Sequence, residues 1–125
     1  MKFIDTSVAI DHLRRRPEAT ALLGRLFQAG EWVGASELVR FEVLSGARPN
    51  ELDETERFLG ILRWLPVDEG VARVGAALAT LYRRSNPGID DVDYLIAATV
   101  LEADAELLTT NVRHFPMLSG LEPAY

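Results

Sequence analysis

The sequence predicts an α/β protein with a central parallel sheet of four to five short strands flanked by helices. Short apolar segments alternate with longer amphipathic segments along the chain, which is the order that β–α–β units produce. The apolar segments are continuous rather than alternating, as in strands whose two faces are both covered. At 125 residues, of which 48% are hydrophobic, we expect one folded domain over residues 1–125.

The composition narrows the class of protein further. The chain has no Cys, so disulfides and thiolate metal sites are excluded. No apolar run approaches the roughly 20 residues of a membrane span, and the opening segment MKFIDTS lacks the apolar stretch of an export signal. We therefore expect a cytoplasmic protein that does not insert into a membrane.

The charge distribution is more informative than the total charge. A net charge of −6 argues against non-specific binding of nucleic acid by the whole surface. Arginine clusters at residues 14–16 and 83–84 present planar guanidinium groups that suit phosphate, although a general preference for Arg would give the same clusters. An acidic site with Arg patches around it is compatible with an anionic substrate held through metal ions.

The first half of the chain supplies two strands and three helices. Residues 2–5 read as a buried strand, and the hydroxyl residues after it can cap a helix that runs to about Arg16. Pro17 suits the first turn of a second helix. Residues 31–35 form a second strand, after which Ser36 caps a third helix.

The second half continues the alternation. Asn50 and Asp90 are expected caps of helices, and Pro66 favours a strand at an edge or a strand end. The expected elements are helices over 50–63, 68–85 and 90–104, strands over 64–67 and 106–110, a helical turn within 111–118 and a candidate fifth strand over 120–125.

Asp5 stands directly behind the first predicted strand. In parallel sheets covered by helices, ligands collect at the carboxyl ends of the strands, so this carboxylate is placed where a site would form. The alternative is that Asp5 serves only as a helix cap.

Two further carboxylates fall on helix faces that should be buried. Glu42 shares a stripe with Val39 and Val43, and Asp93 lines up with Ile96 and Ala97 in the helix after residue 90. An uncompensated buried carboxylate is costly, so each should be paired or bind a cation. A Glu at the edge of the stripe that reaches water, and acids that only stabilise a helix start, are the alternatives.

Asn111 follows the last inner strand, as Asp5 follows the first, although Thr-Asn after a strand is also common turn chemistry. If these side chains meet, their ligands are all oxygens, which point to Mg²⁺ or Mn²⁺ rather than Zn²⁺. The natural chemistry of such a site is hydrolysis of a phosphodiester by a metal-activated water.

Four segments together resemble the PIN-domain family, and within it the VapC-type toxin ribonucleases of bacterial toxin–antitoxin pairs. They are FIDTSVAIDHL, SELVRFEVLSGA, DVDYLIAATVL and LLTTNVRHF, in this order over essentially the whole chain. The resemblance implies a PIN-like three-layer fold and a Mg²⁺-dependent endoribonuclease, with Mn²⁺ as a plausible substitute. It also implies that Asp5, Glu42 and Asp93 form the acidic site, and that Asp5 and Asp93 are the surest ligands.

The resemblance also suggests residues beyond these three acids. Many members of the family carry a fourth acid after the last inner strand, where this chain has Asn111, or His114 slightly later. A neutral fourth ligand would weaken a second metal position, so one bound ion is an option, and Asp91 is a candidate to compensate. In the family, Thr6 lies beside the site.

The family further implies a cognate VapB-type antitoxin whose C-terminal segment lies across the active-site groove, and a homodimer within the toxin–antitoxin complex. The rival interpretations are a PIN-like binding module without catalysis and a nuclease of the same fold that acts on DNA. A receiver-like phosphotransfer domain is disfavoured, because Lys2 is the only lysine and cannot serve that chemistry.

Overall fold

The computed structural model describes residues 1–125 as an α/β fold with a four-stranded parallel sheet, which confirms the predicted class. The strand order is β3-β2-β1-β4. The strands are β1 (Lys2–Ile4), β2 (Val33–Ser36), β3 (Arg63–Leu65) and β4 (Glu106–Leu108). Strand β1 is therefore central, and it pairs with β2 on one side and with β4 on the other.

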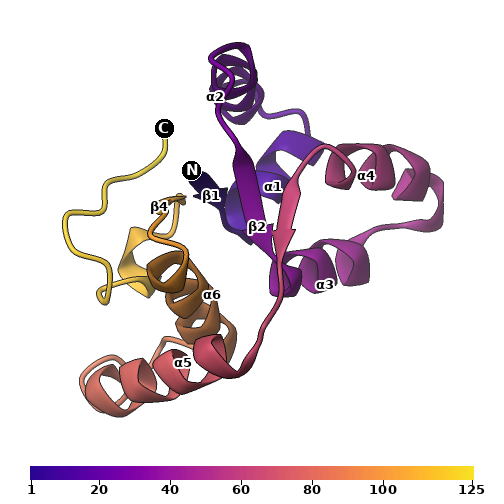
Figure 1. Cartoon of the computed structure of the whole chain (residues 1–125). Helices are drawn as coiled ribbons and strands as arrows, with labels where there is room; N and C mark the ends of the chain where they lie inside the picture. Colours follow the sequence, from indigo (N-terminus) through magenta and orange to yellow (C-terminus); the bar gives the residue numbers. More distant parts are fainter.

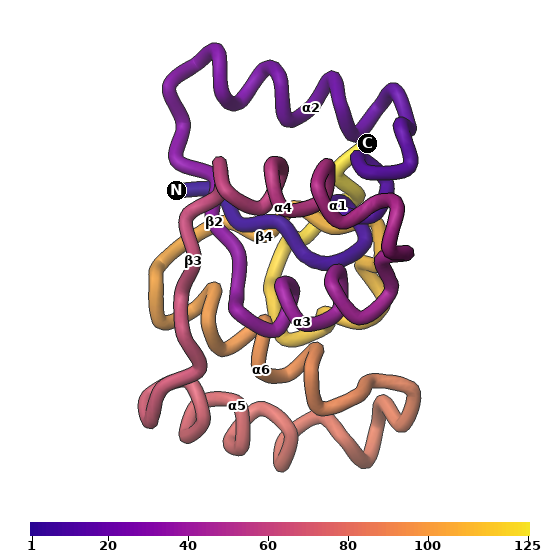
Figure 2. Tube along the Cα trace, turned by 90° about the vertical axis from the view of Figure 1, so that its right-hand side faces the viewer, coloured from indigo at the N-terminus to yellow at the C-terminus, as the bar shows by residue number.

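Six α-helices cover the two faces of the sheet (Figure 1). Helices α5 and α6 lie together on one side of the strands, and α1, α3 and α4 lie on the other (Figure 1). Figure 2 shows α2 as the outermost helix on the second side and α5 as the outermost on the first. The helices are α1 (Thr6–Leu13), α2 (Pro17–Gln28), α3 (Glu37–Gly46), α4 (Leu52–Leu59), α5 (Glu69–Tyr82) and α6 (Asp91–Glu102), with 3₁₀ turns η1 (Pro49–Glu51) and η2 (Val112–His114).

The strand order creates a switch point beside β1. The chain moves from β1 to β2 and β3 in one direction, and it returns across the sheet to β4 on the other side of β1. Right-handed crossovers then place the helices that follow β1 and β2 on one face and those that follow β3 on the other. A crevice opens at the carboxyl ends of β1 and β4, where the two sets of connections separate.

A single hydrophobic core of 22 buried residues holds the layers together. Phe3 and Ile4 of β1 lie at its centre and are almost completely buried. Gly34 of β2 permits the close packing of this region, because a methyl group there would stand 2.8 Å from the ring of Phe3. No helix in the fold combines the length and the apolar character needed to cross a membrane.

Two predicted helix boundaries near the N-terminus need correction. Helix α1 ends at Leu13 rather than near Arg16, and Arg15 adopts a left-handed conformation with φ of 65°. Pro17 explains why the helix does not extend through Arg16, which is extended, since the residue before a proline is disfavoured in the helical region. The N-cap of α1 is Asp5 itself, whose side chain accepts a hydrogen bond from the backbone N–H of Val8.

Three further expectations differ from the fold. Asn50 lies within η1 and does not cap α4, and the helix expected over residues 68–85 ends at Tyr82, before the arginines at 83 and 84. Residues 120–125 form no fifth strand, so the sheet has four. Pro123 lacks the N–H that a ladder requires, and the segment is tied to the sheet end by one bond from the Ala124 N–H to the Thr109 carbonyl.

Candidate active site

A cavity of about 310 Å³ lies at the carboxyl ends of β1 and β4. The side chains that line it come from four separate parts of the chain: the start of α1, the middle of α3, the start of α6 and the segment after β4. They include five acids, of which four are aspartates and one is Glu42, and several side chains with neutral oxygens. The lining residues are Asp5, Thr6, Ser7, Ile10, Asp11, Glu42, Asp90, Asp93, Ile96, Asn111 and His114.

Asp5 is the most deeply buried of these acids, with 4% of its surface exposed. Its Oδ1 accepts hydrogen bonds from the Ser7 hydroxyl at 2.6 Å and from the Val8 N–H at 3.3 Å. Its Oδ2 accepts a bond from the hydroxyl of Thr109, the residue after β4, at 2.5 Å. Burial raises the pKa of Asp5, while these donors act to lower it. Asp5 thus both caps α1 and presents a fixed carboxylate to the cavity.

Glu42 faces the cavity from the half-buried surface of α3. The Thr6 hydroxyl donates a hydrogen bond to its Oε1 at 2.5 Å. This bond joins the first turn of α1 to α3 across the mouth of the site. Thr6 therefore acts on the position of the Glu42 carboxylate, and it lies in the cavity with it.

Asp93 enters from the first turn of α6, and its side chain is 16% exposed. Its backbone N–H is capped by Asp90 Oδ1 at 3.2 Å. Burial raises the pKa of Asp93 to about 6, and the negative charges of Asp90 and Glu42 add to the effect. His114 Nδ1 lies 3.2 Å from Asp93 Oδ2 and acts in the opposite direction. Asp93 therefore carries a proton far more readily than an ordinary aspartate does.

Asn111 lies at the cavity and Asp91 does not. Asn111 lines the cavity from the loop after β4, and its backbone N–H donates to the Thr109 hydroxyl at 2.9 Å. Asp91 does not line it: its carboxylate is 82% exposed and pairs with Arg83 at 2.7 Å. Positions two residues apart on a helix lie on different faces, so Asp91 points away from the cavity while Asp93 points into it. The idea that Asp91 compensates for a neutral fourth ligand is not supported by this geometry.

Several residues of the site were missed from sequence. The sequence predicts Asp90 only as a cap, whereas in the structure it both caps α6 and lines the cavity. Thr109 follows β4 as Asp5 follows β1, a shared position at strand ends that could have identified it. Asp11 lies one turn beyond Ser7 on α1, and its Oδ2 accepts a hydrogen bond from the hydroxyl of Tyr125, the last residue of the chain, at 2.5 Å.

The raised pKa of Asp93 predicts a pH-dependent stability difference in the metal-free protein. The folded carboxyl holds its proton up to about pH 6, whereas the ordinary pKa is 3.8. The folded state therefore binds more protons in this interval, so the contribution of Asp93 to the free energy of unfolding falls as the pH rises through it. We expect Asp93→Asn to melt at a higher temperature than the unaltered chain at neutral pH, with the gain vanishing near pH 4.

Melting curves recorded in chelator across this range check the prediction. The difference between the two proteins is the relevant quantity, because it cancels the titration of the other carboxylates. A gain that is constant with pH would contradict the assignment of the raised pKa to Asp93.

The donor set of the cavity fits a hard divalent cation. All its acidic donors are carboxylates, with amide and hydroxyl oxygens beside them and one imidazole. No three Asp, Glu or His side chains are close enough together to hold one ion as they stand. Mg²⁺ needs fewer, since it usually binds one or two carboxylates and completes its shell with water and substrate phosphate. The mutual repulsion felt by Asp93 is the feature that a cation would relieve.

A parallel sheet in the order β3-β2-β1-β4, with acids gathered at the switch point, is the arrangement expected of a PIN domain. The PIN domain model matches residues 2–118, and the chain belongs to the PIN domain family. Over its full length it is also similar to proteins named as VapC ribonucleases. It is 57% identical over 125 residues to Ribonuclease VapC19 of Mycobacterium tuberculosis, covering all of both chains.

Two further comparisons agree. The chain is 37% identical over 125 residues to Ribonuclease VapC10 of Mycobacterium tuberculosis, covering all of this chain and 93% of that protein. Among solved structures, a toxin–antitoxin complex from Klebsiella pneumoniae matches with a TM-score of 0.83 at 24% identity, covering 100% of this chain and 98% of the other. At that identity the structural match supports the fold.

Proposed function

We propose that this chain is a metal-dependent endoribonuclease that acts as the toxin of a type II toxin–antitoxin pair. One observation carries the proposal: the chain is 57% identical, from end to end, to a protein named as a VapC ribonuclease. The gathering of Asp5, Glu42 and Asp93 at one cavity supports it, because phosphodiester hydrolysis by PIN-type chemistry needs an acidic site. Within this proposal the three acids are the catalytic residues and the ligands of Mg²⁺, for which Mn²⁺ can substitute.

The protein side of the chemistry follows from the contacts of the acids. Ser7 and Thr109 hold the Asp5 carboxylate from both sides, and Thr6 orients Glu42, so two acids face the cavity with little freedom to rotate. When bound, Mg²⁺ lowers the pKa of the attacking water and offsets charge on the leaving oxygen. Asp93 is the acid whose charge is least stable alone, so its ionised form depends most on the cation.

We further propose a VapB-type antitoxin as the partner that silences the site. The Klebsiella structure that shares this fold is itself a toxin–antitoxin complex. The acid-lined cavity and the net charge of −6 would attract a basic peptide segment. A homodimer within that complex and action in the cytoplasm, where cellular RNA is available, complete the proposal.

The test is cleavage of total bacterial RNA and of single-stranded DNA by the purified chain in Mg²⁺ or Mn²⁺. We expect RNA to be cut, DNA to be spared, and cleavage to stop in EDTA and return when the metal is restored. Full activity in EDTA would contradict the metal assignment. Cleavage of DNA instead would favour a DNA nuclease of the same fold, and no cleavage of either would favour a non-catalytic binding module.

Asn111→Asp distinguishes a ligand from a turn residue. An amide oxygen can bind Mg²⁺ but brings no charge, so a carboxylate in the same place should tighten Mn²⁺ binding. In the absence of metal it should lower the melting temperature, because it adds a negative charge to a repulsive cluster. Calorimetric Mn²⁺ titration and melting curves in chelator measure the two effects. If both stay unchanged, Asn111 is only a turn residue, since Asp and Asn serve turns equally well.

A further inference from the structure

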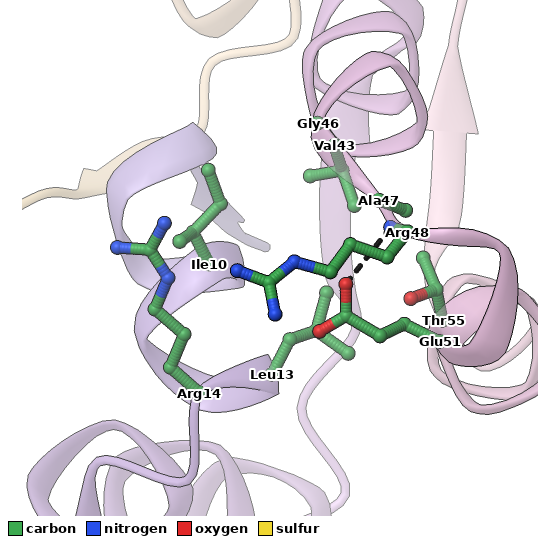
Figure 3. A pocket seen from close by; sticks show the side chains of 9 residues that line it. All are labelled: Ile10, Leu13, Arg14, Val43, Gly46, Ala47, Arg48, Glu51 and Thr55. Carbon is green, nitrogen blue, oxygen red and sulfur yellow. Dashed lines mark hydrogen bonds between the residues drawn. The ribbon is translucent and has the colours of Figure 1, made fainter.

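A second cavity, of about 340 Å³, lies beside the active site between α1, α3 and η1 (Figure 3). Ile10 lines both cavities, and Glu42 of the active site is followed on α3 by Val43 of the second cavity. The two cavities therefore adjoin along the same pair of helices. The lining of the second consists of Ile10, Leu13, Arg14, Val43, Gly46, Ala47, Arg48, Glu51 and Thr55.

Two guanidinium groups face this cavity from opposite walls. Arg48, just after α3, extends across it toward Ile10, and Arg14, just after α1, stands on the far side (Figure 3). Neither guanidinium makes an ion pair, whereas Arg15 and Arg16, next along the chain, both pair with carboxylates. Two exposed guanidiniums without a carboxylate partner suit an anion, and their planar forks match the oxygens of a phosphate.

The cavity also contains one acid, Glu51. Its Oε1 accepts a hydrogen bond from the backbone N–H of Arg48 at 2.8 Å, which holds it beside the turn (Figure 3). The carboxylate pairs with neither guanidinium. The net charge of the three ionised groups in this cavity is therefore +1, in a chain whose total charge is −6.

An RNA strand needs such a positive flank. A bound RNA strand would pass the carboxylates of the active site, which repel its phosphates wherever the proposed Mg²⁺ does not offset their charge. A positively charged groove that tracks the backbone is the usual way in which proteins hold single-stranded nucleic acid. Arg14 lies eight residues beyond Thr6, about 12 Å along the axis of α1, so it can reach a neighbouring phosphate and not the scissile one.

We propose that Arg14 and Arg48 form a phosphate-binding subsite that holds the RNA strand on one side of the scissile bond. The inference rests on the proposed ribonuclease activity. The two arginines act on substrate binding through the backbone of the RNA, so they contribute affinity without sequence preference. They do not take part in the hydrolytic step.

The test is the double variant Arg14→Gln with Arg48→Gln, assayed on total bacterial RNA in Mg²⁺. We expect KM to rise about tenfold with kcat unchanged, and the slope of log affinity against log salt for a labelled oligouridylate to fall by about two. Glu51→Gln, which still accepts the Arg48 N–H, should lower KM. Replacement of both arginines by Lys should give an affinity between those of the unaltered chain and the Gln double variant. Lys keeps the positive charge but lacks the planar fork of the guanidinium.

The matched control is Arg25→Gln with Arg84→Gln. Arg25 and Arg84 make no ion pair and line neither cavity. Replacing them removes the same total charge as replacing Arg14 and Arg48. KM and the salt slope should therefore change little. Equal effects of the two double variants would overturn the subsite in favour of general electrostatics. Unchanged KM with weakened binding of the antitoxin would overturn it in favour of a protein-docking groove. Absence of any RNA cleavage by the unaltered chain would refute the proposed function itself.

Discussion

Replacing Asp5 with Asn is expected to lower RNA cleavage by more than about a hundredfold while the fold survives. Loss of a residue that only supports a metal ligand costs 10- to 100-fold, roughly, so loss of a proposed ligand should exceed that range. Asn keeps one oxygen that can accept from Ser7 and Val8. Its amide can donate to the Thr109 hydroxyl, which accepts as well as donates. The substitution also removes a buried negative charge, and this stabilising effect offsets the stability lost with the weaker hydrogen bonds.

Initial rates of RNA cleavage and a thermal melt measure the two parts of this expectation. Asp104→Asn is the matched control, because Asp104 is exposed and its φ of 50° suits Asn equally well. The control should keep full activity. An Asp5→Asn protein that retains substantial cleavage would remove Asp5 from the catalytic site and leave it as a helix cap.

Asp93→Asn should also abolish cleavage, and at neutral pH it should not lower the melting temperature of the metal-free chain. The carboxylate is destabilised where it lies by burial and by Asp90, so an uncharged amide of the same shape suits the metal-free site better. Metal binding should weaken for the same reason, since the negative charge that attracts the cation is gone. The melting temperature of the variant should therefore respond less to Mn²⁺ than that of the unaltered chain.

Asp91→Asn provides the control for Asp93→Asn within the same helical turn. The substitution is identical, but Asp91 is exposed and pairs with Arg83 outside the cavity. Its loss should leave cleavage and the response to Mn²⁺ nearly unchanged, because an exposed ion pair contributes little. A large fall in melting temperature for Asp93→Asn would instead identify Asp93 as a structural residue.

The sequence was sufficient for the sheet and for the acids that face its end. Periodicity separates strands from helices, and the position of Asp5 after an apolar run needs no tertiary information. Glu42 and Asp93 were recognisable because helical spacing places them among apolar residues. The same rule separates Asp91 from Asp93, since only Asp93 lies on the apolar stripe.

Other features depend on contacts that no local pattern contains. The bond between Thr109 and Asp5 joins residues 104 positions apart, and the approach of His114 to Asp93 is set by the loop after β4. The position of Thr109 after a strand can be read from the sequence, but its bond to Asp5 and the contact of His114 with Asp93 depend on how the strands pair and on the path of the loop. The end of α1 is different, because the proline at residue 17 restricts Arg16 and so predicts from sequence that the helix stops before it.

The order of the strands has a consequence for synthesis of the protein on the ribosome. Strand β1 is made first, yet β4, which completes its pairing, is the last strand to be made. Asp5 gains its Thr109 partner only after that strand, and the final residue, Tyr125, bonds Asp11 at the wall of the same cavity. A nascent chain therefore carries Asp5 through the synthesis of all the later helices and strands before the carboxylate has its Thr109 partner. The cavity at the carboxyl end of β1 is therefore completed only after β4 and the segment that follows it have been made.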